Sequence, residues 1–449
     1  MPQDQIEDWL DGQGNIDFIT LAAIDLNGVF RGKRLPRKLA GKLSSGAVKM
    51  PLAIMGVDIC GTDVVGSGQV FETGDKDGIC VPTGRQPVPI ASDHGDSALI
   101  LASLHTDLET PYAADPRNAL KSVLDRYAKA GLTPVCASEL EFFVYDLDAS
   151  SSEMAVAPQV GGRGQTSAIY AVSELDEFGP FLTDLYAACE KAGIPAESAI
   201  AESGCGQFEV NFHHVRDALR AADDAQLFKH LAKLTARKHG FGATFMAKPF
   251  GEDSGSGLHI HFSLLDSEGV NVFDDGTPQG SKTLLSAVAG LLAAMPDHTA
   301  IFAPHYNSFR RLRAETHAPI SIAWAYENRT AAIRIPDSQN ADRRIEHRVA
   351  GADANPYLVL AAVLGAALVG IETQMEPPAP LEGSSYDQQL PAIPTNWQAA
   401  LQHFRESELN RRIFGELLCT MYLACKEQEL EVLANQVSPI EYDLYLDRV

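Results

Sequence analysis

The sequence lacks the hallmarks of several classes of protein. Its 36 lysines and arginines are outnumbered by 59 aspartates and glutamates, so the basic surplus typical of nucleic-acid binders is missing. The seven cysteines include no Cys-x-x-Cys pair, which argues against a disulfide framework and a zinc site. The longest apolar run, residues 357–371, is shorter than the roughly 20 residues that span a bilayer, and the N-terminus has no signal-peptide pattern. We therefore expect a cytoplasmic protein that binds neither membrane nor nucleic acid.

The length and the order of the predicted elements indicate more than one domain. A chain of 449 residues exceeds the roughly 250–300 residues at which a single hydrophobic core stops growing. The first hundred residues are rich in glycine, proline and short strand-like runs. Asp115-Pro116 then predicts a helix start, and Gly131 fits the end of that helix. Predicted strands and helices alternate from there: strands 133–145, 206–212 and 241–246, and helices 175–192 and 216–238. This alternation alone favours an α/β fold with a domain boundary near 105–114.

Four glutamates stand in two short motifs. In residues 138–144 (SELEFFV), strand alternation puts Glu139 and Glu141 on one face, roughly 7 Å apart, where they are solvated or share a cation. In residues 202–209 (ESGCGQFE), Glu202 and Glu209 flank a glycine-containing turn that can bring them together, although an ordinary hairpin has the same pattern. Neither motif identifies a site by itself.

A third motif, residues 255–263 (GSGLHIHFS), joins small residues to two histidines. Strand alternation directs His259, His261 and Ser263 to one side, where the histidines are either structural or ligate a metal. The Gly-Ser-Gly segment before them is expected to leave backbone N–H groups free for an anion.

Of the eight arginines in residues 310–348 of this acidic chain, seven are candidates for binding an anion: Arg310, Arg311, Arg329, Arg334, Arg343, Arg344 and Arg348. Guanidinium groups bind phosphate and carboxylate through two parallel hydrogen bonds, and salt bridges to the abundant acids are the alternative. Carboxylate donors favour Mg²⁺ or Mn²⁺ over zinc, and nucleotide phosphates are the obvious bridging anion. No Walker A motif or dinucleotide-binding glycine motif is present.

Six motifs, in this order, resemble those of the glutamine synthetase family: SELEFFVYD, ESGCGQFEVNF, FMAKPFGEDSGSGLHIHFSL, NSFRRL, AWAYENRTAAIRIP and RRIEHR followed by ADANPYL. The resemblance covers nearly the whole chain. It implies an α+β fold in place of plain α/β, with a β-grasp domain in residues 1–108 and a catalytic domain built on a curved antiparallel sheet in residues 109–449. It also implies a homo-oligomer, usually a dodecamer of two hexameric rings whose active sites are shared between adjacent subunits.

The resemblance further assigns roles, residue by residue. It implies that a first divalent metal ion is held by Glu141, Glu202 and Glu209. A second is implied to be held by Glu139, His259 and Glu346. The residues implied to hold glutamate are Arg311, Arg348 and the backbone of Gly255. Those implied to contact ATP and the transferred phosphate are His261, Ser263, Arg334, Arg344 and the catalytic Arg329.

The implied chemistry has two steps, with ATP as co-substrate and two or more Mg²⁺ or Mn²⁺ ions. ATP phosphorylates the γ-carboxylate of glutamate while the metal ions and arginines stabilise the transferring group. An amine then attacks the γ-glutamyl phosphate and gives a γ-glutamyl amide, ADP and phosphate.

Three departures from the family's pattern concern the amine. His317 stands where true glutamine synthetases carry a flap glutamate before Ala-Pro, and Ser254 replaces the usual asparagine of the glycine loop. The Asp-Gly-Ser-Ser latch that helps to hold ammonium is unrecognisable in residues 53–65. These losses are similar to those of the γ-glutamylpolyamine synthetases, which act on putrescine or related amines. His317 is then a candidate base, Glu315 or a phosphate is the alternative, and a third interpretation is that His317 only closes the flap.

Two other functions stay open at this point. One is ordinary glutamine synthesis from ammonia with a tolerant flap. The other is a non-catalytic structural or sensing role, against which the complete set of metal-ligand positions and arginines argues.

Overall fold

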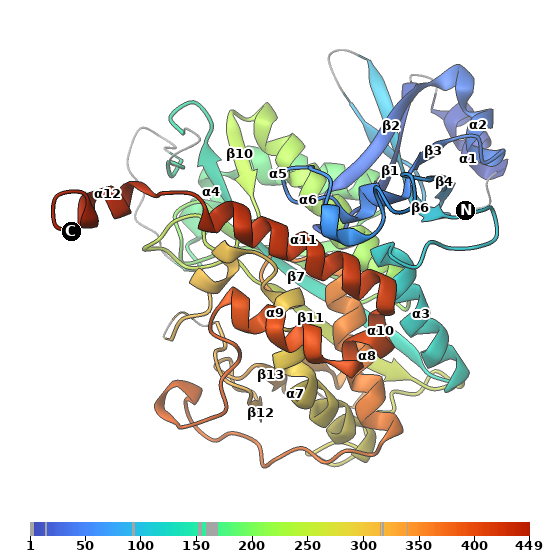
Figure 1. The fold of residues 1–449 in the computed structure, drawn as a ribbon. Helices are drawn as coiled ribbons and strands as arrows, with labels where there is room; N and C mark the ends of the chain where they lie inside the picture. The colour runs from blue at the N-terminus through green and yellow to red at the C-terminus, as the bar shows by residue number, and fades with distance from the viewer. Residues whose placement is uncertain are drawn as a thin grey trace.

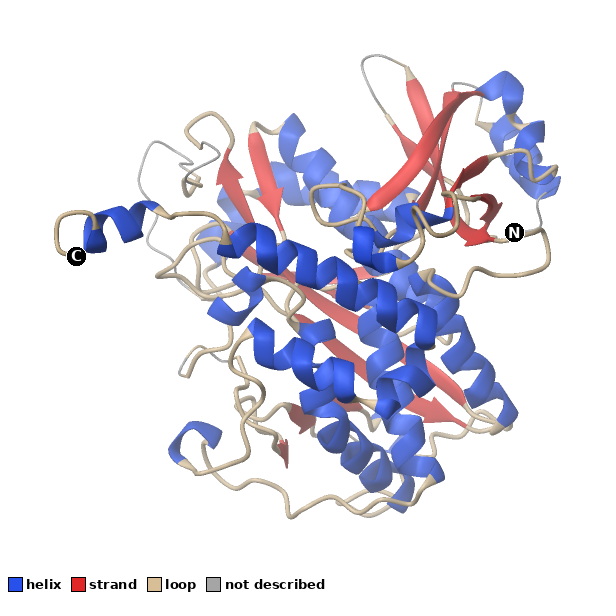
Figure 2. Ribbon diagram, in the orientation of Figure 1, coloured by secondary structure: helices blue, strands red, loops and turns tan. Residues whose placement is uncertain are grey.

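Two β-sheets and the helices packed around them form the computed structural model (Figures 1 and 2). It describes residues 4–13, 16–91, 95–150, 155–158, 169–314, 316, 318–338 and 340–449. The smaller sheet lies at the N-terminal end of the molecule, and the C-terminal helix projects on the opposite side of the view (Figure 1).

The smaller sheet is mainly antiparallel and has the strand order β2-β1-β6-β4-β3, with β5 paired to β6. Its strands are β1 (Ile16–Ile24), β2 (Phe30–Pro36), β3 (Lys49–Pro51), β4 (Asp77–Pro82), β5 (Val88–Ile90) and β6 (Asp96–His105). Only β1 and β6 run parallel among these described pairs. Two helices accompany this sheet, α1 (Asp4–Gly12) and α2 (Gly41–Ser44).

The larger sheet carries the candidate site and has the order β12-β13-β14-β11-β7-β9-β8, with β10 paired to β7. Its strands are β7 (Thr133–Asp146), β8 (Ala196–Ala201), β9 (Gln207–Phe212), β10 (Phe241–Thr244), β11 (Leu258–Leu265), β12 (Trp324–Tyr326), β13 (Ile333–Ile335) and β14 (Ile345–His347). All described pairs except β12–β13 are antiparallel. The α+β fold implied by the resemblance is therefore confirmed, and the α/β fold suggested by alternation is wrong, because the intervening helices connect antiparallel strands.

The larger part contains helices close to the positions that the sequence predicts, residues 116–131, 175–192, 216–238 and 357–371, and further helices for which no bounds are predicted. They are α3 (Pro116–Lys129), α4 (Val172–Glu177), α5 (Gly179–Lys191), α6 (Ala218–Lys238), α7 (Lys282–Phe302), α8 (Pro356–Glu372), α9 (Trp397–Glu406), α10 (Glu408–Phe414), α11 (Glu416–Ala434) and α12 (Pro439–Tyr445). The Asp115 side chain caps α3 by accepting from the Arg117 N–H at 2.8 Å. The predicted helix 175–192 is divided at Phe178 into α4 and α5. The division into domains at residue 108 stays a prediction.

The apolar run 357–371 folds as the buried helix α8, which packs against α7. The two helices approach closely at a pair of glycines. A Cβ on Gly290 would lie 2.3 Å from the Ala366 carbonyl oxygen, and one on Gly370 would lie 2.1 Å from that of Ser286. By length and composition α7 alone, among the described helices, could cross a membrane, but 72% of its apolar window is buried inside the protein.

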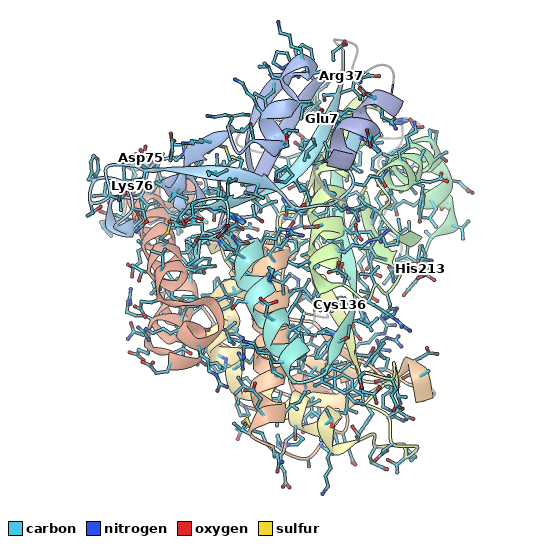
Figure 3. All side chains as sticks on the ribbon, turned by 90° about the vertical axis from the view of Figure 1, so that its right-hand side faces the viewer. Glu7, Arg37, Asp75, Lys76, Cys136 and His213 are labelled. Atoms are coloured by element: carbon cyan, nitrogen blue, oxygen red, sulfur yellow. The ribbon has the colours of Figure 1, made fainter. Side chains whose placement is uncertain are left out.

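Most cysteines belong to the core. Cys136 on β7, labelled in Figure 3, is fully buried, and burial raises the pKa of its thiol far above the ordinary value. Such a thiol is an inert core side chain.

Helix α11 fastens the N-terminal segment to the rest of the chain. The Glu429 carboxylate accepts from the Ile59 N–H at 2.8 Å and from the Lys426 ammonium at 3.0 Å. Lys426 also donates to the Asn27 side chain. Burial alone would raise the pKa of Glu429, but Lys426 and His305 lower it to about 2.

This low pKa predicts an acid-sensitive contribution to stability. Because the pKa of Glu429 is depressed from 4.5 to about 2, its stabilisation is complete above pH 4.5 and is lost as the pH falls toward 2. The full effect is on the order of 3 kcal/mol. We expect Glu429→Gln to have a lower free energy of unfolding than wild type at pH 6.5, measured by urea denaturation. The difference in free energy of unfolding between the two proteins should be smaller at pH 4. The exposed neighbour Glu431→Gln serves as control, and a gap that is independent of pH would contradict this assignment.

Candidate active site

A cavity of about 280 Å³ opens against the larger sheet. Its lining brings together residues from all six motifs, and half of them are charged or histidine side chains. The lining residues are Glu141, Ile169, Tyr170, Glu202, Ser203, Glu209, Ser254, Gly255, His259, Arg311, Thr316, Ala318, Arg329 and Arg348.

The register of three neighbouring strands positions the acidic side of the cavity. Glu139 on β7 pairs with His259 on β11, and Glu141 pairs with Glu209 on β9. The predicted shared face of Glu139 and Glu141 is therefore confirmed. The turn between β8 and β9 places Glu202 beside them, and it is held by a hydrogen bond from the Glu202 N–H to the Gln207 carbonyl at 2.9 Å.

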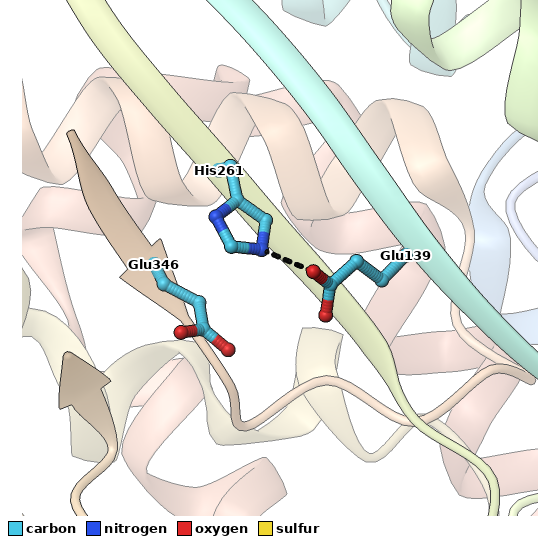
Figure 4. A group of neighbouring side chains, drawn as sticks. All are labelled: Glu139, His261 and Glu346. Atoms are coloured by element: carbon cyan, nitrogen blue, oxygen red, sulfur yellow. Dashed lines mark ion pairs between the residues drawn. The ribbon is translucent and has the colours of Figure 1, made fainter. Parts of the chain in front are cut away.

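Beneath the cavity lies a compact cluster of carboxylates and imidazoles. His261 Nε2 lies 2.9 Å from Glu139 Oε1, as Figure 4 shows, with the Glu346 carboxylate on the other side of the ring. His259 Nδ1 lies 3.1 Å from Glu139 Oε2. The neighbouring Glu141 accepts from the Gly257 N–H at 2.6 Å. The two imidazoles thus separate carboxylates that would otherwise repel one another.

Arginines close the cluster on its other side. Arg334 donates to Glu346 Oε2 at 2.7 Å, and Arg348 donates to Glu346 Oε1. Arg311 donates through Nη1 to the Val349 carbonyl at 2.8 Å and is buried. The Arg344 Nε atom lies 3.3 Å from His261 Nδ1. Buried guanidinium groups of this kind pre-orient an anion site, because little conformational entropy remains to be lost on binding.

The carboxylates differ in their affinity for protons. Burial and repulsion from Glu141 raise the pKa of Glu202 to about 7, and burial together with Glu139 raises that of Glu209 still further. Burial opposes ionisation of Glu346, yet His261, Arg348 and His259 lower its pKa to about 2. The pKa of Glu139 is likewise held well below its ordinary range by His259 and His261, against burial. Perturbed carboxylates in a cavity are typical of functional sites.

The donor set suits hard divalent cations. One ligand atom from each residue of two groups lies within 4.8 Å of the others: Glu139, His261 and Glu346, and Glu139, Glu209 and His259. Carboxylate oxygens predominate, and a cation between them would relieve the repulsion that raises the pKa of Glu202 and Glu209. The residues therefore fit Mg²⁺ or Mn²⁺.

Comparison with known proteins decides the family. Residues 113–445 match the family model described as "Glutamine synthetase, catalytic domain". The chain belongs to the glutamine synthetase family.

Sequence similarity to members of this family extends over nearly the whole chain. Gamma-glutamylputrescine synthetase PuuA of Escherichia coli is 36% identical over 445 residues, covering 98% of this chain and 94% of the relative. Glutamate–isopropylamine ligase of a Pseudomonas species is 31% identical and covers 96% of this chain and 95% of its own. The solved structure "Apo GmaS without ligand" has a TM-score of 0.85 and 28% identity, covering 98% of this chain and 99% of its own. The predicted family, fold and class of glutamate–amine ligase are confirmed.

Within this glutamine synthetase fold, most of the predicted site residues are brought together. Eight of them line the cavity: Glu141, Glu202, Glu209, Gly255, His259, Arg311, Arg329 and Arg348. Four more contact the cluster beneath it: Glu139, His261, Arg334 and Glu346. Arg344 joins them through His261, while Ser263 is buried further along β11 and does not line the cavity. His317 and Glu315 lie outside the described residues.

The expectation that the glycine segment leaves its backbone N–H groups free is wrong for two of its three residues. The backbone N–H of Ser256 donates to the Ala247 carbonyl at 2.9 Å, and that of Gly257 donates to Glu141, so neither is free for an anion. The segment is instead held in place by the acid beside it. Glycine is required at 255 for another reason, because a Cβ there would lie 2.6 Å from Arg311 Cγ.

Several residues of the cavity carry no sequence signal. Ile169 and Tyr170 form part of its wall and are more than half exposed. Tyr170 has a φ of +60°, in the left-handed region that is uncommon for a tyrosine, and its N–H donates to the Ala201 carbonyl at 2.8 Å. A backbone strained in this way is found where the surrounding structure fixes a side chain.

Proposed function

We propose that this chain is an ATP-dependent ligase that joins the γ-carboxylate of glutamate to an organic primary amine, with putrescine first among the candidates. One observation carries the proposal: a single cavity is lined by three carboxylates, a histidine and three arginines. The acids suit the metal ions that accompany ATP, and the arginines suit glutamate and the transferred phosphate.

The residues that would hold divalent metal ions are Glu141, Glu202 and Glu209 for one, and Glu139, His259 and Glu346 for the other. When bound, such ions supply charge stabilisation for the transferring phosphoryl group. His261, which the resemblance implies for the nucleotide, lies close enough to Glu139 and Glu346 to share the second set. Enzymes of this family use ATP and divalent metals.

The arginines divide the work of binding. Arg311 and Arg348 lie on the cavity wall beside Gly255, where their guanidinium groups would hold the carboxylates of glutamate. Arg329, exposed at the cavity, would neutralise the charge that develops on the transferred phosphate, and Arg334 and Arg344 would act from the nucleotide side. Attack of the uncharged amine on the γ-glutamyl phosphate then completes the amide.

Three features favour an organic amine over ammonium. The cavity wall contains the apolar Ile169 and the ring of Tyr170, which can contact methylene groups. Asp58, the first acid in the latch segment 53–65, is buried and accepts from the Thr62 N–H and the Gln428 side chain within the same chain. The flap position holds His317 instead of a glutamate.

We further propose that the enzyme is cytoplasmic and works as a homo-oligomer, most simply a dodecamer of two hexameric rings, as the family resemblance implies. Sedimentation velocity of the purified chain measures this directly. A monodisperse monomer with full activity would contradict it.

The function is tested by phosphate release with ATP, Mg²⁺ and glutamate across a panel of amines that includes ammonium. We expect release that depends on glutamate and is fastest with a diamine or alkylamine. Preference for ammonium would favour the second candidate, glutamine synthesis, since glutamine synthetases of Halobacterium salinarum and Thermotoga maritima are 30% and 31% identical to this chain. No glutamate-dependent release with any amine would favour a non-catalytic role.

Replacing Arg348 tests the glutamate subsite. We expect Arg348→Ala to raise the KM for glutamate at least about tenfold, since a buried charge-assisted contact is worth a few kcal/mol. Arg310→Ala is the matched control, because Arg310 lies near the site but contacts the ring of Tyr306 instead. An unchanged KM for glutamate in Arg348→Ala would count against the assignment.

A further inference from the structure

Residues 383–393, here called the strap, connect two loops that line the cavity. One is the loop of residues 318–322, which begins at the cavity-lining Ala318. The other is the loop of residues 328–330, which contains the cavity-lining Arg329. The two loops flank the strand β12, and the strap is a second connection between them because it is hydrogen-bonded to both.

The strap holds both neighbours of Arg329. The Asn328 side chain donates to the Gly383 carbonyl at 2.6 Å. The Ser385 N–H donates to Thr330 Oγ1 at 3.0 Å, and its hydroxyl donates to the Thr330 carbonyl at 2.8 Å. Ser385 is 1% exposed, so these hydrogen bonds are protected from water.

The strap also holds the loop of residues 318–322. The Tyr386 hydroxyl donates to the Ala318 carbonyl at 3.0 Å. Further along, the Ile322 N–H donates to the Pro391 carbonyl at 2.7 Å, and the Ile393 N–H donates to the Ile320 carbonyl at 3.1 Å. The last two contacts are backbone pairings that any sequence could make. The Tyr386 contact is the one that depends on a side chain.

The location of Tyr386 relates this contact to the substrate side of the cavity. Its phenol is half-buried, and burial raises its pKa against the nearby charges of Arg348 and Arg311. These are the two arginines of the proposed glutamate subsite. The carbonyl that Tyr386 holds belongs to Ala318, which is 3% exposed and forms part of the same cavity.

We propose that Tyr386 is a positioning residue: its hydroxyl fixes Ala318 and, through the strap, sets the place of this cavity wall relative to Arg329. The consequence for catalysis rests on the proposed function. If Ala318 is displaced, water enters beside the γ-glutamyl phosphate. The oxygen of water then bonds to the acyl carbon and loses its proton to solvent or to the leaving phosphate. The bond from that carbon to the phosphate oxygen breaks with its electron pair on phosphate, and glutamate and phosphate leave without an amide.

Tyr386→Phe removes only the hydroxyl. The matched control is Tyr326→Phe, since the Tyr326 hydroxyl also donates to a backbone carbonyl, that of Gln279 at 2.9 Å, outside the cavity. With saturating glutamate, ATP and putrescine, we expect the ratio of phosphate released to amide formed to rise about threefold or more in Tyr386→Phe. We expect no change in Tyr326→Phe. An unchanged ratio in Tyr386→Phe would overturn the catalytic consequence.

Hydrogen exchange provides a readout that does not need activity. The Ile322 amide, bonded to the strap, is expected to exchange at least about threefold faster in Tyr386→Phe than in wild type, and equally in Tyr326→Phe. Equal exchange in wild type and Tyr386→Phe would overturn the positioning role. Faster exchange in an enzyme whose wild type shows no glutamate-dependent phosphate release would support the positioning role while refuting the proposed function.

Discussion

Glu141→Ala is expected to abolish amide formation while leaving the fold intact. Glu141 lines the cavity between His259 and Glu209, and repulsion from it contributes to the raised pKa of Glu202. Removing one acid of such a cluster eases the repulsion in the folded chain but removes a ligand for the cation. The proposed cation would supply several kcal/mol of transition-state stabilisation, so kcat/KM should fall by at least about 100-fold. Glu202→Ala is expected to have the same effect.

One further variant separates the charge of Glu141 from its hydrogen bond, and a second variant serves as the control. Glu141→Gln keeps an oxygen that can accept from the Gly257 N–H but loses the negative charge, so it should be nearly as inactive as Glu141→Ala. Glu190→Ala on the exposed face of α5 should retain full activity. Calorimetry should show that Glu141→Ala and Glu141→Gln bind Mn²⁺ more weakly than wild type. Thermal unfolding should show that the Tm of both variants is unchanged or higher. Full activity in Glu141→Ala would refute the metal assignment.

The parts of the fold that the sequence predicts well are those with local signals. The alternating pattern of residues 133–145 became β7, and Asp115-Pro116 became the capped start of α3. The sheet arrangement was harder to predict, because helix–strand alternation looks the same whether the strands run parallel or antiparallel. Only the motif resemblance favoured the α+β fold. The division of one predicted helix into α4 and α5 coincides with Gly179-Pro180, a local break signal that the predicted helix 175–192 did not take into account.

The candidate site shows the same division between local and long-range information. Strand alternation was enough to place Glu139 and Glu141 together. The pairing of Glu346 with Arg334 depends on the register of β13 and β14, whereas Arg348 pairs with Glu346 locally, two residues further along the chain. Ile169 and Tyr170 enter the cavity through a loop with no motif, and the strap contact of Tyr386 joins residues 68 positions apart. Such contacts are set by the packing of the whole domain.

The choice of amine is expected to distinguish this enzyme from glutamine synthetases. Ammonium is small and strongly hydrated, so its binding needs anionic groups close by. The flap carboxylate is replaced by His317, and the buried Asp58 is engaged by Thr62 and Gln428. An organic amine recovers about 0.8 kcal/mol for each methylene buried against the wall formed by Ile169 and Tyr170. We therefore expect kcat/KM for putrescine to exceed that for ammonium by at least about tenfold. This ratio requires about 1.4 kcal/mol of additional transition-state stabilisation for putrescine.

Two variants examine the origin of this preference. His317→Glu restores a carboxylate at the flap position and should narrow the gap by improving the use of ammonium, measured as kcat/KM at a fixed pH. Ile169→Ala removes part of the apolar wall. It should also reduce the difference, because kcat/KM for putrescine is expected to fall while kcat/KM for ammonium stays unchanged. An alkylamine must lose a proton before attack, since its pKa is near the 10.4 of lysine, so both amines should be compared at the same fraction of free base. If wild-type enzyme prefers ammonium at every pH tested, the missing latch and flap acids have no bearing on specificity, and glutamine synthesis is the better assignment.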